Sequence, residues 1–191
     1  MVEGVEKTDW SIRFYQASSS EMFGASKISP QNEQTPFQPI SPYGASKLTA
    51  HLGVGNFRNA YGLHASAGIM FNHESPMRSL EFVTRKITYT LANISCGVET
   101  VLSLGNIDAR RDWGYAGDYV QAMWAMLQQD EPGDYVIATG ISYSVKSFTE
   151  KAAACLGFNI IWEGVADEAR GFDKFTGRLL VNIDTNLYRP I

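Results

Sequence analysis

The sequence lacks any apolar stretch of the roughly 20 residues that a membrane-spanning helix needs. Its first residues, 1–7, also lack the charged-then-apolar layout of a secretory signal peptide. Positive charge is not in excess, since 16 Lys and Arg stand against 20 Asp and Glu and give a net charge of −4. We therefore expect a cytoplasmic protein with no affinity for a membrane or a nucleic acid backbone.

Cysteine is scarce, with only Cys96 and Cys155, which lie far apart in the chain. Neither has a second Cys or a His at the spacing of a metal site, so we predict no bound metal and two reduced cysteines in the core. Apolar residues are plentiful: 45% of the 191 residues are hydrophobic and 12% are aromatic. That composition can build a full core and excludes disordered and low-complexity classes.

Strand and helix patterns alternate along the chain. Short apolar runs predict strands at 12–17, 65–71, 100–104, 134–138, 159–162 and 178–183. Helical periodicity and end signals predict helices at 43–61, 82–94, 115–129 and 147–156. The alternation favours an α/β fold, with a smaller and more irregular subdomain towards the C-terminus.

Tyr43 and Lys47 are four residues apart at the start of a predicted helix that follows Ser41-Pro42. This spacing puts both side chains on one face, at the electropositive end of the helix. An ammonium group and a helix N-terminus both favour the phenolate form of a tyrosine, which can then accept a hydroxyl proton. The bare pattern is common by chance and equally fits a surface aromatic residue beside a solvated lysine.

A cluster of hydroxyl groups and a carboxylate, Ala17-Ser-Ser-Ser-Glu21, stands at the end of the first predicted strand. Followed by Ser41-Pro-Tyr-Gly-Ala-Ser-Lys47, it resembles the extended short-chain dehydrogenases that act on nucleotide sugars. Six later blocks narrow the resemblance to the GDP-mannose 4,6-dehydratases: Phe71-Asn-His-Glu-Ser-Pro76, Phe82-Val-Thr-Arg-Lys86-Ile, Leu104-Gly-Asn-Ile-Asp-Ala-Arg-Arg-Asp-Trp-Gly114, Met126-Leu-Gln-Gln-Asp-Glu-Pro132, Tyr135-Val-Ile-Ala-Thr-Gly140 and Tyr188-Arg-Pro190.

The resemblance implies roles for four catalytic residues. Tyr43 would deprotonate the hydroxyl on hexose carbon 4 as hydride moves to NADP, and Lys47 would hold the nicotinamide ribose. Glu21 would abstract the carbon 5 proton so that water leaves from carbon 6, with Ser19 assisting at carbon 4. Return of the hydride to carbon 6 would convert GDP-mannose to GDP-4-dehydro-6-deoxymannose.

The resemblance also implies a binding site for each ligand. His73 and Arg78 would join Tyr43 and Lys47 in binding NADP. The expected GDP-mannose contacts are Asn72, Lys86, Arg111 and Arg189. Two alternatives stay open: Arg111 could form a structural ion pair with Asp112, and Asn72 and His73 could merely cap a turn.

The fold implied is a partial Rossmann-like parallel sheet with helices, plus a smaller mixed α/β subdomain for the nucleotide sugar. Residues 1–75, with 107–140 returning, are expected in the Rossmann-like part, and 76–106 with 141–191 in the substrate-binding subdomain. The family's glycine-rich loop and the strands before it have no match in this sequence. We therefore expect either a homo-oligomer or a complementing N-terminal portion to cover the exposed strand edge.

That missing loop leaves two functional alternatives, a non-catalytic nucleotide-sugar binder and a related epimerase. Gly53-Val-Gly55 does not replace it, because it lies inside the predicted helix, where each glycine costs about 1 kcal/mol relative to alanine. His51 and His64 have no metal partners in view and are interpreted as helix-face or loop residues.

Overall fold

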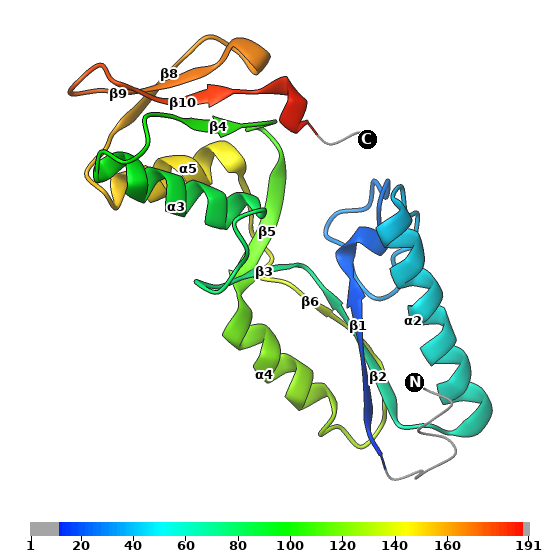
Figure 1. Cartoon of the computed structure of the whole chain (residues 1–191). Coiled ribbons are helices and arrows are strands. Elements are labelled where there is room, and N and C mark those ends of the chain that lie inside the picture. The colour runs from blue at the N-terminus through cyan, green and yellow to red at the C-terminus, as the bar shows by residue number, and fades with distance from the viewer. Residues whose placement is uncertain (1–11, 189–191) are drawn as a thin grey trace. The chain divides into compact units, whose positions relative to one another are not determined.

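The computed structural model describes residues 12–188, and the chain forms two compact units (Figure 1). Unit 1 comprises Met1–His73 and Asp112–Ile141, and unit 2 comprises Glu74–Arg111 and Ser142–Ile191. The chain changes unit three times, each time in or beside a strand of a sheet with the order β3-β5-β7. These short strands are β3 (Asn72–Glu74), β5 (Arg110–Tyr115) and β7 (Ser142–Ser144).

Unit 1 is built on a parallel sheet of order β1-β2-β6. Its strands are β1 (Phe14–Ser19), β2 (Ala65–Met70) and β6 (Asp134–Ile137). Helices α2 (Pro42–Tyr61) and α4 (Ala116–Met126) lie on opposite sides of this sheet (Figure 1). Successive side chains of β2 point to opposite faces of the sheet. Ile69 packs with Met22 and Phe23 on one face, and Met70 packs with Tyr119 on the other. The predicted α/β class with a parallel sheet is confirmed.

The ends of α2 follow from its sequence. The Ser41 side chain accepts a hydrogen bond from the Gly44 N–H, and Pro42 occupies the first turn, where its missing N–H costs nothing. Gly62 ends the helix in the left-handed region, with φ of 66°. The helix continues unbroken through Gly53 and Gly55 because packing of its Val54 side against Leu63 and Ala65 outweighs their low helix propensity.

Strand β1 differs from its prediction as a buried strand. Only Ser18 and Ser19 are buried, whereas Phe14, Tyr15 and Gln16 are half-buried and Ala17 is exposed. The reason is position, since β1 pairs only with β2 among the described residues and forms the edge of its sheet. Burial is concentrated at the carboxyl end, where Ser18 hydrogen-bonds His51 of α2.

Unit 2 contains a mixed sheet of order β4-β10-β9-β8 with two helices packed against it. Strands β4 and β10 are parallel, and the other pairs are antiparallel. The elements are α3 (Val83–Ser95), β4 (Leu102–Leu104), α5 (Val145–Ala154), β8 (Ile160–Glu163), β9 (Arg170–Asp173) and β10 (Leu179–Ile183). Three 3-10 turns complete the described elements: η1 (Ser20–Met22), η2 (Ala166–Glu168) and η3 (Thr185–Leu187).

Two expectations from the sequence need correction. The polar, charged segments at β3, β5, β7 and β9 gave no strand signal, because three of them are too short for a clear alternation and β5 carries two arginines and an aspartate. Cys96 and Cys155 are free but exposed, since each ends a helix at the surface instead of pointing into the core. No described helix is long and apolar enough to cross a membrane.

Candidate active site

The carboxyl end of β1 carries the first pair of predicted catalytic residues. Ser19 is the last residue of the strand, and its hydroxyl accepts the Glu21 N–H at 3.2 Å, which caps the η1 turn. The next two residues, Met22 and Phe23, are almost completely buried and anchor the turn in the core. Glu21 itself is exposed, so its carboxylate stands on a fixed turn with access to solvent.

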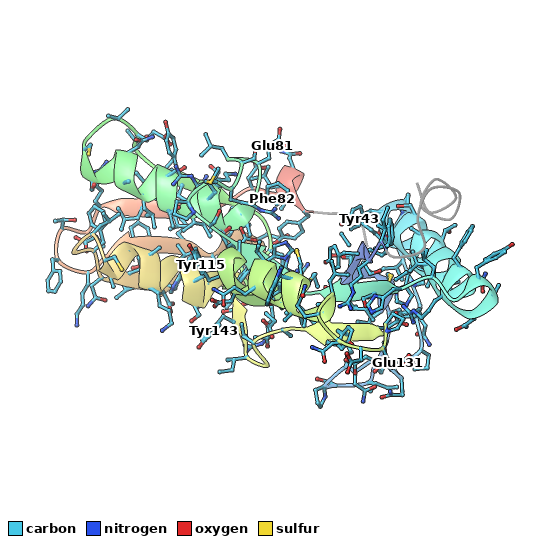
Figure 2. All side chains as sticks on the ribbon, turned by 90° about the horizontal axis from the view of Figure 1, so that it is seen from below. Tyr43, Glu81, Phe82, Tyr115, Glu131 and Tyr143 are labelled. Carbon is cyan, nitrogen blue, oxygen red and sulfur yellow. The ribbon has the colours of Figure 1, made fainter. Side chains whose placement is uncertain are left out.

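The second pair stands on the first two turns of α2. Tyr43 is 54% exposed, and Figure 2 labels it at the start of this helix. The Lys47 ammonium lies 5.6 Å from the centre of the Tyr43 ring and donates to the Ala17 carbonyl at 2.9 Å. Lys47 therefore links the helix to β1 while its charge stays beside the phenol.

The two pairs lie close together because α2 packs tightly on the η1 turn. A Cβ atom added to Gly44, the neighbour of Tyr43, would lie 2.6 Å from the Glu21 carbonyl oxygen. The start of α2, which carries the phenol and the ammonium, is therefore in close contact with the turn that carries the hydroxyl and the carboxylate. Such groups can remove protons from a bound hydroxyl and from a neighbouring C–H bond.

Asn72 and His73 lie beyond the same edge of the sheet. Ser19 pairs with Met70 in the register of β1 and β2, so the residues that follow Met70 emerge where Ser19 does. The His73 Nδ1 atom donates to the Phe71 carbonyl at 2.9 Å, and its ring stacks on Tyr119 with centroids 4.9 Å apart. In the neutral ring this bond leaves Nε2 as the hydrogen-bond acceptor.

Asp112 settles one open alternative. Its carboxylate accepts hydrogen bonds from the Thr139 N–H and hydroxyl and from the Gly140 N–H, at 2.8 to 3.0 Å. Its exposed neighbour Arg111 instead donates to the Arg110 carbonyl at 2.7 Å. The structural Arg111–Asp112 ion pair is therefore wrong, because Asp112 is committed to the loop that follows β6.

Unit 2 holds other predicted ligand contacts. Arg78 pairs with Glu74 at 3.2 Å, and its guanidinium lies 3.4 Å from the centre of the Phe82 ring. Glu74 also accepts from the Thr84 hydroxyl at 2.8 Å, so Arg78 is held on two sides. Lys86 is half-buried on α3, and Arg189 lies outside the described residues.

One residue in unit 1 was undervalued from the sequence. His51, expected on a helix face or in a loop, lies on α2 and is buried: it is 6% exposed, and its Nδ1 atom lies 2.9 Å from the Ser18 hydroxyl. The signal was available, since His51 follows Lys47 by four residues and Tyr43 by eight and so shares their helix face. No group of side chains that could bind a metal occurs among residues 12–188.

A family model described as GDP-mannose 4,6 dehydratase matches residues 1–191. The chain belongs to this family. It is 56% identical over 178 residues to the GDP-mannose 4,6-dehydratase of Sinorhizobium fredii (strain HH103), covering 93% of this chain and 51% of that protein. The match to the Homo sapiens GDP-mannose 4,6 dehydratase is 54% over 180 residues, covering 94% and 48%. The chain thus spans about half the length of these curated relatives.

Solved structures agree on the fold. RMD from Pseudomonas aeruginosa, complexed with NADPH, superposes with a TM-score of 0.80 at 21% identity, over 96% of this chain and 57% of that one. At this identity the likeness establishes the Rossmann-type architecture. The family assignment comes from the family model and from the more similar sequence relatives. The roles of individual residues of this chain stay predictions.

Proposed function

We propose that this chain carries the catalytic residues of a GDP-mannose 4,6-dehydratase. The reaction would convert GDP-mannose to GDP-4-dehydro-6-deoxymannose and water. The observation that carries the proposal is the convergence of Tyr43 and Lys47 on α2 with Ser19 and Glu21 at the end of β1. Membership of the family supports the substrate class.

Tyr43 would begin the reaction by accepting the proton of the carbon 4 hydroxyl. The ammonium of Lys47 lies 5.6 Å from the centre of the Tyr43 ring and places a positive charge beside the phenol. Ser19 would hydrogen-bond the same oxygen and help to hold it. Loss of the proton and of a hydride leaves a ketone at carbon 4, which acidifies the C–H bond at carbon 5.

Glu21 would then take the carbon 5 proton. Electrons from the broken C–H bond form a double bond between carbons 5 and 6, and the C–O bond at carbon 6 breaks. The hydroxyl leaves as water with the proton that Glu21 has taken from carbon 5. Return of the hydride to carbon 6, and addition of a solvent proton at carbon 5 in place of the one that Tyr43 releases, complete the product. An exposed carboxylate on a turn fixed by Met22 and Phe23 suits such repeated proton transfer.

The residues of unit 1 fit the nicotinamide end of a dinucleotide. A phenol, an ammonium and a histidine with Nε2 as acceptor offer complementary groups to the two ribose hydroxyls and the carboxamide. We assign Tyr43, Lys47 and His73 to this end, and Arg78 to a phosphate because a guanidinium binds phosphate oxygens through two donors. When bound, the dinucleotide, which we propose is NADP, supplies the hydride acceptor and later the donor.

Asn72, Lys86, Arg111 and Arg189 would bind the GDP-mannose. A pyrophosphate requires several cationic donors, and three of these four residues are basic in a chain of net charge −4. The same proposal gives most cofactor contacts to unit 1 and most nucleotide-sugar contacts to unit 2, with Arg78 of unit 2 and Asn72 of unit 1 as the exceptions.

We also propose that another strand covers the β1 edge, from a second copy or from a complementing N-terminal portion. The half-buried Phe14 and Tyr15 support this, since apolar side chains on an edge strand favour pairing. Analytical ultracentrifugation tests it: a monomer that unfolds in one sharp calorimetric transition would rule it out.

Proton exchange at carbon 5 tests the catalytic proposal directly. GDP-mannose and NADP are incubated with the protein in deuterated water, and deuterium at carbon 5 is followed by NMR. Glu21→Gln should abolish the exchange, whereas Glu131→Gln, an exposed carboxylate before the amino end of β6 (Figure 2), should leave it unchanged. Persistent exchange in Glu21→Gln contradicts the role of Glu21. Separate calorimetric titrations distinguish a mere binder, which would bind GDP-mannose without NADP.

A further inference from the structure

His51 lies at the junction between the two halves of the proposed catalytic cluster. It shares a face of α2 with Tyr43 and Lys47, one helical turn after the lysine. Its Nδ1 atom lies 2.9 Å from the Ser18 hydroxyl on β1, and its ring meets the edge of Phe37 with centroids 5.2 Å apart. The side chain is therefore locked on both sides, although it never reaches the exposed carboxylate or phenol.

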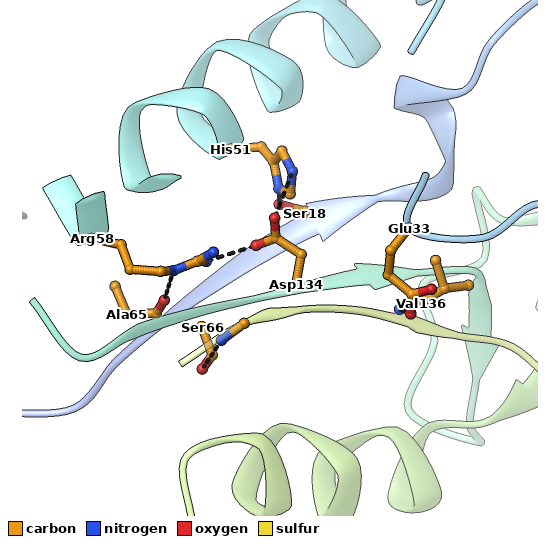
Figure 3. A network of polar contacts seen from close by, with 9 residues as sticks. Ser18, Glu33, His51, Arg58, Ala65, Ser66, Asp134 and Val136 are labelled. Atoms are coloured by element: carbon orange, nitrogen blue, oxygen red, sulfur yellow. Dashed lines mark hydrogen bonds and ion pairs between the residues drawn. The ribbon is translucent and has the colours of Figure 1, made fainter. Parts of the chain in front are cut away.

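The contacts of His51 extend across the whole sheet of unit 1 (Figure 3). Its Nε2 atom lies 3.7 Å from the Asp134 carboxylate on β6. Asp134 accepts from Arg58 at 2.7 Å, and Arg58 also donates to the Ala65 carbonyl on β2 at 2.7 Å. A single side-chain network thus ties α2 to all three strands.

Ser18 is the point at which this network reaches the catalytic residues. The side chain of the next residue, Ser19, points to the opposite face of the sheet, and its hydroxyl caps the turn that carries Glu21. A shift of Ser18 relative to α2 would therefore displace Ser19 and Glu21 relative to Tyr43. Small displacements matter here, because a misplacement of about 1 Å can cost about a hundredfold in rate.

We infer that His51, through Ser18, is a positioning residue that sets the register between the end of β1 and helix α2, so that Glu21 and Tyr43 act on the same sugar. The inference deepens the proposed function and rests on it. His51 touches neither the substrate nor the cofactor in this role. Its action depends on the hydrogen bond to Ser18 and on the charge of the ring.

The charges around His51 favour the neutral ring. Burial lowers its pKa below the usual 6.5, Asp134 on β6 opposes this shift, and Arg58 on its own helix adds to it. The other packed elements add no charge to the ring itself: β1 contributes the Ser18 hydroxyl, and the loop contributes Phe37, while Glu33 of that loop accepts the Val136 N–H. With Asp134 facing Nε2, the neutral ring carries its hydrogen there and accepts from Ser18 at Nδ1. Protonation would reverse the bond to Ser18.

Three substitutions separate positioning from packing. His51→Leu and Ser18→Ala each remove the hydrogen bond, whereas His51→Asn keeps an amide near the place of Nδ1 and cannot titrate. We expect kcat to fall about tenfold or more in the first two, with KM for GDP-mannose within about twofold. The double variant should be no worse than either single variant, because both remove one interaction.

His51→Asn should recover most of kcat and lose the part of the acid limb of the kcat–pH profile that His51 causes below pH 6.5. His64→Asn is the matched control, since it removes a histidine of unit 1 at the opposite end of the sheet, beside the Gln129 carbonyl. It should leave both kcat and the acid limb unchanged. Equal losses of kcat in His51→Asn and His51→Leu would overturn the inference. Additive losses of kcat in the double variant His51→Leu/Ser18→Ala would also overturn it.

A second measurement does not depend on turnover. In an NMR titration of the whole chain, the amide signals of residues 19–22 should follow the pKa of the His51 ring, and His51→Asn should abolish this dependence. Amide signals that ignore His51 would overturn the positioning role. If they follow His51 but the unsubstituted protein does not act on GDP-mannose with NADP, the positioning stands and the proposed function fails.

Discussion

Helix α2 offers a test of how backbone freedom limits the stability of unit 1. Gly53 and Gly55 lie in its interior, and a Cβ atom at either position would meet nothing within 4 Å. The substitution to alanine therefore adds no strain and only reduces the freedom of the unfolded chain. Each change should raise the free energy of unfolding by about 0.5–1 kcal/mol.

The two effects should add, because residues two apart in a helix do not face each other. The double variant Gly53→Ala/Gly55→Ala is then expected to gain about 1–2 kcal/mol, or about 2–8 °C in Tm for a chain of this size. Urea unfolding followed by circular dichroism measures the change, with the m-value checked for constancy.

Gly62, the C-terminal cap of the same helix, provides the matched control. Its Cβ position is also open, but its φ of 66° is a left-handed conformation that costs an L residue about 1–2 kcal/mol. Gly62→Ala should therefore lower stability, although the added methyl group is the same. A stabilised Gly62→Ala, or a destabilised Gly53→Ala, would refute the account.

Four further predictions concern buried polar groups. Tyr15 and Tyr119 have buried hydroxyls with no protein partner, so each Tyr→Phe change should stabilise the fold by about 1 kcal/mol in urea unfolding; a loss of stability would indicate a partner. Burial raises the pKa of both tyrosines from 10.0 to about 12, so the unfolded chain ionises first and stability should fall between pH 10 and 12, less steeply in the double Phe variant. The His51 pKa is lowered instead, so the unfolded chain binds the proton first and the contribution of His51 to stability, complete above pH 6.5, is lost as the pH falls. Calorimetry should find a weaker dependence of stability on pH in His51→Asn. Asp112→Asn keeps the shape of the side chain but sets an NH₂ group against a backbone N–H. The free energy of unfolding should fall by about 1–3 kcal/mol in urea, and an unchanged midpoint would contradict the observed hydrogen bonds.

The long elements of the fold were predictable because their signals are local. For α2, the Ser41 cap, Pro42 and Gly62 are all written in adjacent positions, and the observed helix runs within one residue of the predicted one. Short β3 and β7 could not be found in this way, since three residues show no periodicity. The exposed cysteines were misjudged because burial depends on where a helix ends against its neighbours.

For the site, the motifs identified the family and the chemistry expected of Tyr43, Lys47, Ser19 and Glu21. They could not show that α2 approaches the η1 turn closely enough to bring these four together, since that distance depends on packing between segments 20 or more residues apart. The role of His51 was hidden for the same reason: its partners Ser18 and Asp134 come from two other strands.

The sequence by itself determined the α/β class, the ends of helix α2 and the membership of the GDP-mannose 4,6-dehydratase family. These features depend on local conformational preferences of the residues and on sequence motifs, both of which can be read without the fold. Only the tertiary structure decided that β1 is an edge strand buried at one end, that Asp112 binds the loop after β6 and that His51 joins α2 to the sheet. Hydrogen bonds and burial of this kind arise between residues brought together by folding, and the order of residues alone does not specify them.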